Sequence, residues 1–83
     1  MGPLSLESLN EGVRVVYAND GQLVGTLKLI RGQWRFKALG FDAAGDLIPG
    51  GGLLTDKHNT IVAQDSSESV TEALIATGQG ERR

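Results

Sequence analysis

The chain lacks several residue types that would otherwise indicate how it is held together. It has 83 residues, with no cysteine, one tryptophan, one tyrosine, two phenylalanines and two prolines. Without cysteine there is neither a disulfide nor a thiolate metal site to compensate for a small core. A chain this short buries only about 60–65% of the surface that its unfolded form exposes. We therefore expect one domain, residues 1–83, whose core is completed by homodimerisation.

Long apolar runs are also missing. No stretch approaches the ~18 apolar residues of a membrane-spanning helix. The first residues, MGPLSL, have neither the basic start nor the apolar centre of a signal peptide. These absences predict a cytoplasmic protein that does not enter a membrane.

Acidic residues are absent from one continuous part of the chain. Residues 21–41 contain no Asp or Glu but four basic residues, namely Lys28, Arg31, Arg35 and Lys37. From residue 42 to the end, seven acids stand against three basic residues. The net charge of −2 argues against unselective binding of nucleic acid. The segregation of charge nevertheless predicts a surface with one basic face.

The centre of the chain is predicted to be an antiparallel meander over residues 13–48. Three segments rich in β-branched, apolar and aromatic residues predict its strands, at 13–18, 22–30 and 33–41. Asn19-Asp20-Gly21 and Arg31-Gly32 supply the turns between them. Residues 46–48 follow a DAAG turn and are a candidate fourth strand that pairs back onto the third.

The two ends of the chain flank this meander. Residues 1–12, with leucines at 4, 6 and 9, are predicted to form an N-terminal arm or a single helical turn. Residues 49–59 are a glycine-rich connector. Residues 60–78 form a short strand at 60–63 and then a helix, and residues 79–83 fray as a tail.

The helix has start signals and an apolar side. Asp65, Ser66 and Ser67 are its alternative N-caps, and Val70, Ala73, Leu74 and Thr77 follow helical spacing with Gly78 after them. The expected fold class is therefore α+β: a small antiparallel meander of three to four strands with one C-terminal helix. The PGGG run would also serve as the hinge of a segment-swapped dimer.

The second hairpin has a register that the turn determines. A two-residue Arg31-Gly32 turn pairs Ile30 with Gln33 and then each successive residue outward. The further pairs are Leu29–Trp34, Lys28–Arg35, Leu27–Phe36 and Thr26–Lys37. The apolar pairs share one face and the basic residues share the other, so Trp34 and Phe36 are expected in the core rather than stacked on bases.

The first hairpin allows two registers. A two-residue turn at Asp20-Gly21 would place Arg14 opposite Leu27, on the apolar face. A three-residue loop at 19–21 pairs Tyr17 with Leu23 and places Arg14 opposite Thr26, on the basic face. The second register keeps the apolar face free of charge, and it is the one predicted.

The expected basic face suggests phosphate binding. Its residues are Arg14, Lys28, Arg31 at the turn, Arg35 and Lys37, with Arg82 and Arg83 assisting from the tail. Lys28 opposite Arg35 is a repulsive pair unless an anion joins it. Two alternatives stay open. Small sheets use Lys and Arg to protect exposed faces, and Val16, Val24 and Ile30 on the same face would suit a protein-binding surface.

Catalytic and metal-binding functions have little support in the sequence. His58 and Asp56 are too few ligands for a metal site, and no nucleophile, base and orienting group can be assembled. The segment IPGGG lacks the Gly-Lys-Ser/Thr ending of a phosphate-binding loop. We expect no enzymatic activity, no metal and no cofactor.

The basic meander, the segment WRFKALGFDAAGDLIPGGG and the capped helix together resemble a family of small plasmid-encoded proteins of plant-pathogenic bacteria, encoded beside type IV secretion genes. The resemblance implies a homodimer with exchanged C-terminal segments that binds DNA and acts in transcription regulation. The function predicted is a DNA-binding accessory or regulatory protein. The alternative is a non-catalytic protein-interaction module in a secretion or conjugation assembly.

Overall fold

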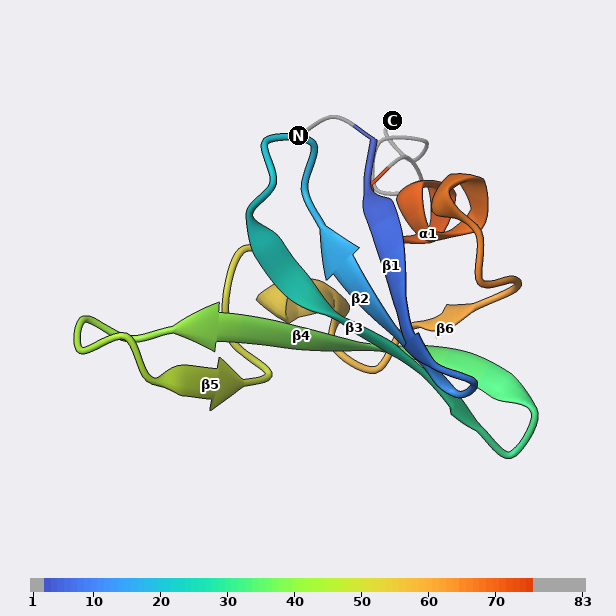
Figure 1. The fold of residues 1–83 in the computed structure, drawn as a ribbon, viewed down its shortest axis with the longest axis horizontal. Coiled ribbons are helices and arrows are strands. Elements are labelled where there is room, and N and C mark those ends of the chain that lie inside the picture. The colour runs from blue at the N-terminus through green and yellow to red at the C-terminus, as the bar shows by residue number, and fades with distance from the viewer. Residues whose placement is uncertain (1–2, 76–83) are drawn as a thin grey trace.

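The computed structural model describes residues 3–75 as one bent antiparallel sheet with one α-helix (Figure 1). The strands follow the order β1-β2-β3-β4-β5, and β6 pairs with β4 as well. The elements are β1 (Ser5–Asn10), β2 (Val13–Tyr17), β3 (Leu23–Ile30), β4 (Gln33–Phe41), β5 (Leu47–Pro49), the 3-10 helix η1 (Thr55–Lys57), β6 (Ile61–Val62) and α1 (Ser67–Leu74). The predicted α+β class with one C-terminal helix is confirmed, and the sheet has six strands instead of three or four.

The N-terminal segment is a strand, so the prediction of an arm or a helical turn is wrong. β1 pairs antiparallel with β2, with Leu6 opposite Val16. Leu4 is buried and Leu6 packs against the core, which is the period-2 pattern of a strand. A bulge after Ser8 leaves Leu9 65% exposed. Because Leu9 is apolar but exposed, the leucines at 4, 6 and 9 do not show the alternation of a strand in the sequence.

The hairpin of β3 and β4 has the predicted register. All five predicted pairs, from Ile30–Gln33 to Thr26–Lys37, are present, and Gly25–Ala38 extends them. Arg31 and Gly32 have φ angles of 54° and 80°. Positive φ at both central residues defines a type I′ turn, whose twist matches that of the strands.

The hairpin of β2 and β3 departs from the predicted register after its first pair. The three-residue loop is present, since the Ala18 amide donates to the Gln22 carbonyl (2.8 Å), and Tyr17 pairs with Leu23. Val24 then bulges, and Arg14 lies opposite Leu27 instead of Thr26. With the bulge, Val16 and Val24 are both completely buried. The predicted register has no bulge and would have left both valines on the outer face, without the stabilisation that their burial provides.

Helix α1 covers the inner face of the sheet beside β1 and β6 (Figure 1). Ser66 is the N-cap, because its hydroxyl oxygen accepts from the Ser69 amide (3.1 Å). Val70 and Leu74 are buried, as their spacing predicted, while the predicted positions of Thr77 and Gly78 lie outside the described residues. No helix among residues 3–75 has the length and apolar character needed to cross a membrane.

The connector 49–59 packs along one edge of β4, between β5 and β6. The amide of Gly50 donates to the Ala38 carbonyl (2.7 Å), and the amide of Asn59 donates to the Phe36 carbonyl (2.7 Å). The Ala38 amide in turn donates to Nδ1 of His58 (3.0 Å). These bonds satisfy the backbone groups of β4 where neither neighbouring strand reaches them.

Candidate nucleic-acid interface

The face of the sheet that points away from α1 is called here the outer face. Strand alternation determines its members, because Phe36 and Leu27 form a buried pair on the inner face and their neighbours point outward. The outer face at its centre consists of Val13, Val15, Thr26, Lys28, Ile30, Arg35, Lys37, Leu39 and Ile61.

Four basic residues of the outer face and its adjoining turn form what we call the basic cluster: Lys28, Arg31, Arg35 and Lys37. Lys28 lies directly opposite Arg35, and Lys37 lies on the next row of β4. Strands β2 to β6 contain only one other charged residue, Arg14, and no acid. Among the described residues the single ion pair is Arg14–Asp65, so the whole basic cluster lacks a carboxylate partner.

Electrostatics make this arrangement unfavourable without a ligand. Like charges directly opposite each other in a sheet are destabilising, by up to about 1 kcal/mol. Lys28 and Arg31 are exposed, whereas Arg35 and Lys37 are half-buried. An anion bound over this face would be attracted to several of these cations at once and would reduce the repulsion between them.

Asn59 holds two members of the basic cluster in place. Its side-chain Oδ1 accepts from Lys37 Nζ (2.5 Å), and its carbonyl accepts from a guanidinium nitrogen of Arg35 (3.2 Å). Asn59 has a φ of 73°, a conformation that Asn tolerates better than most residues. Sequence reasoning missed Asn59, because its partners lie 22 and 24 residues away and no local pattern connects them.

Arg31 occupies a position that its residue type does not favour. The first central residue of a type I′ turn is usually Asn, Asp or Gly, because it requires positive φ, and Arg31 has a φ of 54°. A non-glycine residue in this region costs of order 1 kcal/mol. The turn therefore carries a charge at its tip at some expense of stability.

Replacing Arg31 with asparagine is expected to raise the stability of the protein and to lower its attraction for phosphate groups. The Arg31→Asn variant should be a few tenths to about 1 kcal/mol more stable, since Asn accepts the left-handed conformation at lower cost. It should also attract phosphate groups more weakly, because one charge of the basic cluster is removed. Urea denaturation and a DNA titration measure the two effects, and a variant that is less stable than the wild type would contradict this account of the turn.

Arg14 does not belong to the outer face, so its predicted place beside Lys28 is wrong. Its guanidinium lies 5.0 Å from the centre of the Trp34 ring and 3.1 Å from an Asp65 carboxylate oxygen. It also donates to the carbonyls of Asn10 (2.5 Å) and Val13 (3.1 Å). With its side chain only 19% exposed, Arg14 has its partners within the protein.

The predicted apolar centre of a protein-binding surface is largely buried. Val16 and Val24 are both 0% exposed, so their assignment to the outer face is wrong. Ile30 remains there and is 38% exposed. Because two of the three residues belong to the core, the interaction surface described from the sequence does not exist in that form.

Glu7, the only acid within the described strands, has its own partner. Glu7 on β1 lies opposite Val15 and accepts a hydrogen bond from the Tyr17 hydroxyl (3.0 Å). This hydrogen bond is the main reason why the pKa of Tyr17 is raised above its ordinary value. In the sheet β2 separates Glu7 from Lys28 on β3, and β2 and β3 together separate it from Arg35 and Lys37 on β4; no ion pair among the described residues joins Glu7 to the basic cluster.

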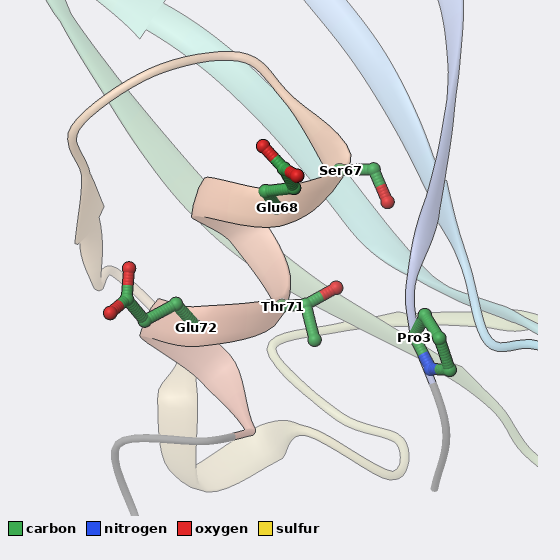
Figure 2. Close-up of a pocket in the computed structure, with 5 residues that line it drawn as sticks. All are labelled: Pro3, Ser67, Glu68, Thr71 and Glu72. Carbon is green, nitrogen blue, oxygen red and sulfur yellow. The ribbon is translucent and has the colours of Figure 1, made fainter.

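A hollow of about 450 Å³ lies away from the outer face, between the N-terminal segment and α1 (Figure 2). Figure 2 shows Ser67 and Thr71 pointing toward the chain at Pro3, with the Glu68 and Glu72 carboxylates directed away from it. The two hydroxyl groups already bind the backbone of Leu4, one accepting from its amide and the other donating to its carbonyl. The two charged residues that border the hollow, Glu68 and Glu72, are both acidic, so this hollow does not suit an anion.

Comparison of the chain with protein-family models, with curated proteins and with solved structures found no match. The function proposed below therefore rests on the geometry of the outer face.

Proposed function

We propose that the protein binds DNA, with Lys28, Arg31, Arg35 and Lys37 contacting phosphate groups from the outer face. The observation that carries the proposal is the Lys28–Arg35 pair, two cations facing each other within an acid-free part of the sheet. Binding of such a cluster to DNA releases condensed counterions, which is a large favourable contribution to affinity.

The shape of the β3–β4 hairpin supports the same proposal. It extends beyond the neighbouring strands and carries Arg31 at its turn (Figure 1). Two-stranded β-ribbons of this kind fit into a DNA groove. Asn59 binds Arg35 and Lys37 at the edge of β4 that faces away from β3, while Lys28 lies on β3, so the cations are spread across the width of the ribbon.

The proposal includes a homodimer in an accessory or transcription-regulatory role. Among the described residues, eight large apolar side chains are at least 38% exposed, and burial of some of them against a second copy would enlarge a small core. A second copy would cover part of this surface and would double the number of phosphate contacts. Sedimentation that shows only monomer at micromolar concentration would rule out the dimer.

Charge reversal tests the DNA contact. The Lys28→Glu/Arg35→Glu variant should bind a duplex about tenfold more weakly or worse. The slope of log affinity against log salt, measured between about 50 and about 200 mM, should fall by about 0.9 for each phosphate that the variant no longer neutralises. Fluorescence anisotropy of a labelled duplex gives both numbers. Binding that is absent at low salt, or is unchanged by the reversal, would contradict the proposal.

Arg14 offers a matched control for net charge. Lys28→Gln and Arg14→Gln each remove one positive charge, but only Lys28 lies on the outer face. At a temperature well below unfolding, Lys28→Gln should weaken duplex binding and lower the salt slope, while Arg14→Gln should leave both close to wild type. Equal effects would mean that net charge, and not the basic cluster, governs binding.

A further inference from the structure

A second hollow, of about 380 Å³, adjoins the basic cluster on the outer face. Its two sides differ in chemistry. Lys28 and Lys37, two members of the basic cluster, line one side, and Leu39, Leu47, Pro49 and His58 line the other. The volume lies within the range of about 300–1,000 Å³ that is common for small-molecule sites.

The apolar side of this outer-face hollow is held in place by main-chain pairing. Leu39 on β4 pairs with Pro49 on β5, and both lie on the outer face together with Leu47. Leu47 is 51% exposed, so its side chain is available to a ligand. The hollow is therefore a feature of the β4–β5 pairing and does not depend on a loose loop.

His58 adds a flat ring with a defined orientation. Its Nδ1 accepts a hydrogen bond from the Ala38 amide (3.0 Å), which requires Nδ1 to be unprotonated and places the hydrogen of the neutral ring on Nε2. The ring also lies close to the backbone at Gly50. Histidine rings are among the side chains on which unpaired bases stack.

We infer that this hollow accepts an unpaired base of single-stranded nucleic acid, an inference that rests on the proposed binding of nucleic acid by the basic cluster. A nucleotide joins a flat, largely apolar base to an anionic phosphate. That division matches the apolar wall at Leu39 and Leu47 and the ammonium groups of Lys28 and Lys37. Arg35 and Arg31 continue the row of cations beyond the hollow, as a strand with successive phosphates requires.

A base in the hollow would make the protein prefer single strands. In a duplex the bases are stacked and paired, so the hollow stays empty and only phosphate contacts form. In a single strand a base is free to leave the backbone path and enter the hollow, which adds stacking and apolar contact to the same phosphate contacts. The protein should therefore bind a single strand more tightly than a duplex at equal salt.

The test uses one oligonucleotide of about 16 residues, alone and annealed to its complement, with the full chain. Wild type should bind the single strand about tenfold more tightly than the duplex. The Leu47→Ser variant should lose about fivefold to tenfold in affinity for the single strand and keep its affinity for the duplex. Ile48→Ser is the control, since Ile48 is also exposed but points to the opposite face of β5 and does not line the hollow.

The outcomes separate this inference from the proposed function. Equal affinity for the two forms, with no effect of Leu47→Ser, would overturn the base-binding hollow and leave DNA binding intact. Failure to bind either form would overturn both. Binding of the corresponding nucleoside monophosphate as tightly as the oligonucleotide would assign the hollow to a free nucleotide, and would overturn the assignment to a strand. Thermal unfolding of each variant establishes that it is folded at the titration temperature.

Discussion

Replacing Phe36 with alanine is expected to destabilise the protein by about 3–5 kcal/mol, which is comparable with the whole stability of many small domains. Phe36 is 0% exposed and pairs with Leu27 at the centre of the inner face. Its ring covers Gly25, where an added Cβ would lie 2.6 Å from the ring carbons. Since β4 pairs with β3, β5 and β6, a cavity at this position weakens three strand pairings at once.

The two phenylalanines of the chain lie on the same strand, which provides a matched control. Phe41 is 54% exposed, so Phe41→Ala should cost less than about 1 kcal/mol. Urea denaturation followed by the fluorescence of Trp34, the only tryptophan, measures both variants. If Phe36→Ala leaves no folded protein, Phe36→Leu keeps part of the volume and should show an intermediate loss. Equal losses for Phe36→Ala and Phe41→Ala would contradict the described core.

Replacing Gly52 with alanine is expected to cost about 2–5 kcal/mol, from two causes that add. Gly52 has a φ of 90°, a region that costs an L residue about 1–2 kcal/mol. An added Cβ would also lie 2.9 Å from the Leu39 carbonyl carbon, and crowding of this kind in a packed site costs about 1–3 kcal/mol. The obstacle is backbone, which cannot rotate away as a side chain can.

Substitutions at two other glycines measure the backbone conformation and the crowding separately. Gly45 has a φ of 86° with nothing within 4 Å of an added Cβ, so Gly45→Ala measures the backbone conformation alone. Gly40 has no positive φ, but an added Cβ would lie 2.7 Å from the Gly52 Cα, so Gly40→Ala measures the crowding. Thermal unfolding should rank Gly52→Ala as the least stable of the three. A loss at Gly52 no larger than that at Gly45 would show that the connector does not pack on β4 as described.

The close approach of Gly40 and Gly52 also explains why the connector was difficult to interpret from sequence. A run of glycines is typical of a loose connector and equally typical of backbone packed against backbone. The two cases differ only in whether another chain segment lies within a few ångströms. That segment is β4, and nothing in residues 49–52 indicates it.

The basic cluster was predictable from sequence, because its geometry is local. Lys28, Arg31, Arg35 and Lys37 lie on one hairpin, and a two-residue turn determines which residue faces which. Asn59 and the His58 wall of the outer-face hollow were not predictable. They reach the same face from a segment about 20 residues further along the chain, through hydrogen bonds that no sequence spacing encodes.

Arg14 shows where local reasoning fails. The predicted register kept its charge away from the apolar face, which is a sound rule when only two strands are considered. In the folded protein Trp34 and Asp65 provide an aromatic ring and a carboxylate for the guanidinium on that face. A charge was acceptable there because distant residues paired with it, and the bulge at Val24 could then bury both valines.

The sequence by itself determined the β3–β4 hairpin, the inward position of Phe36, a helix start within residues 65–67 and the opposition of Lys28 and Arg35. Each of these depends on residues close together in the chain, through turn geometry, alternation and capping. Only the tertiary structure decided the pairing of β1, the bulge at Val24, the contacts of Arg14 with Trp34 and Asp65, and the hollow beside Lys37. Those features depend on contacts between segments that are far apart in the sequence. The free energy of these contacts is distributed over residues from several segments, so no short stretch of sequence specifies them.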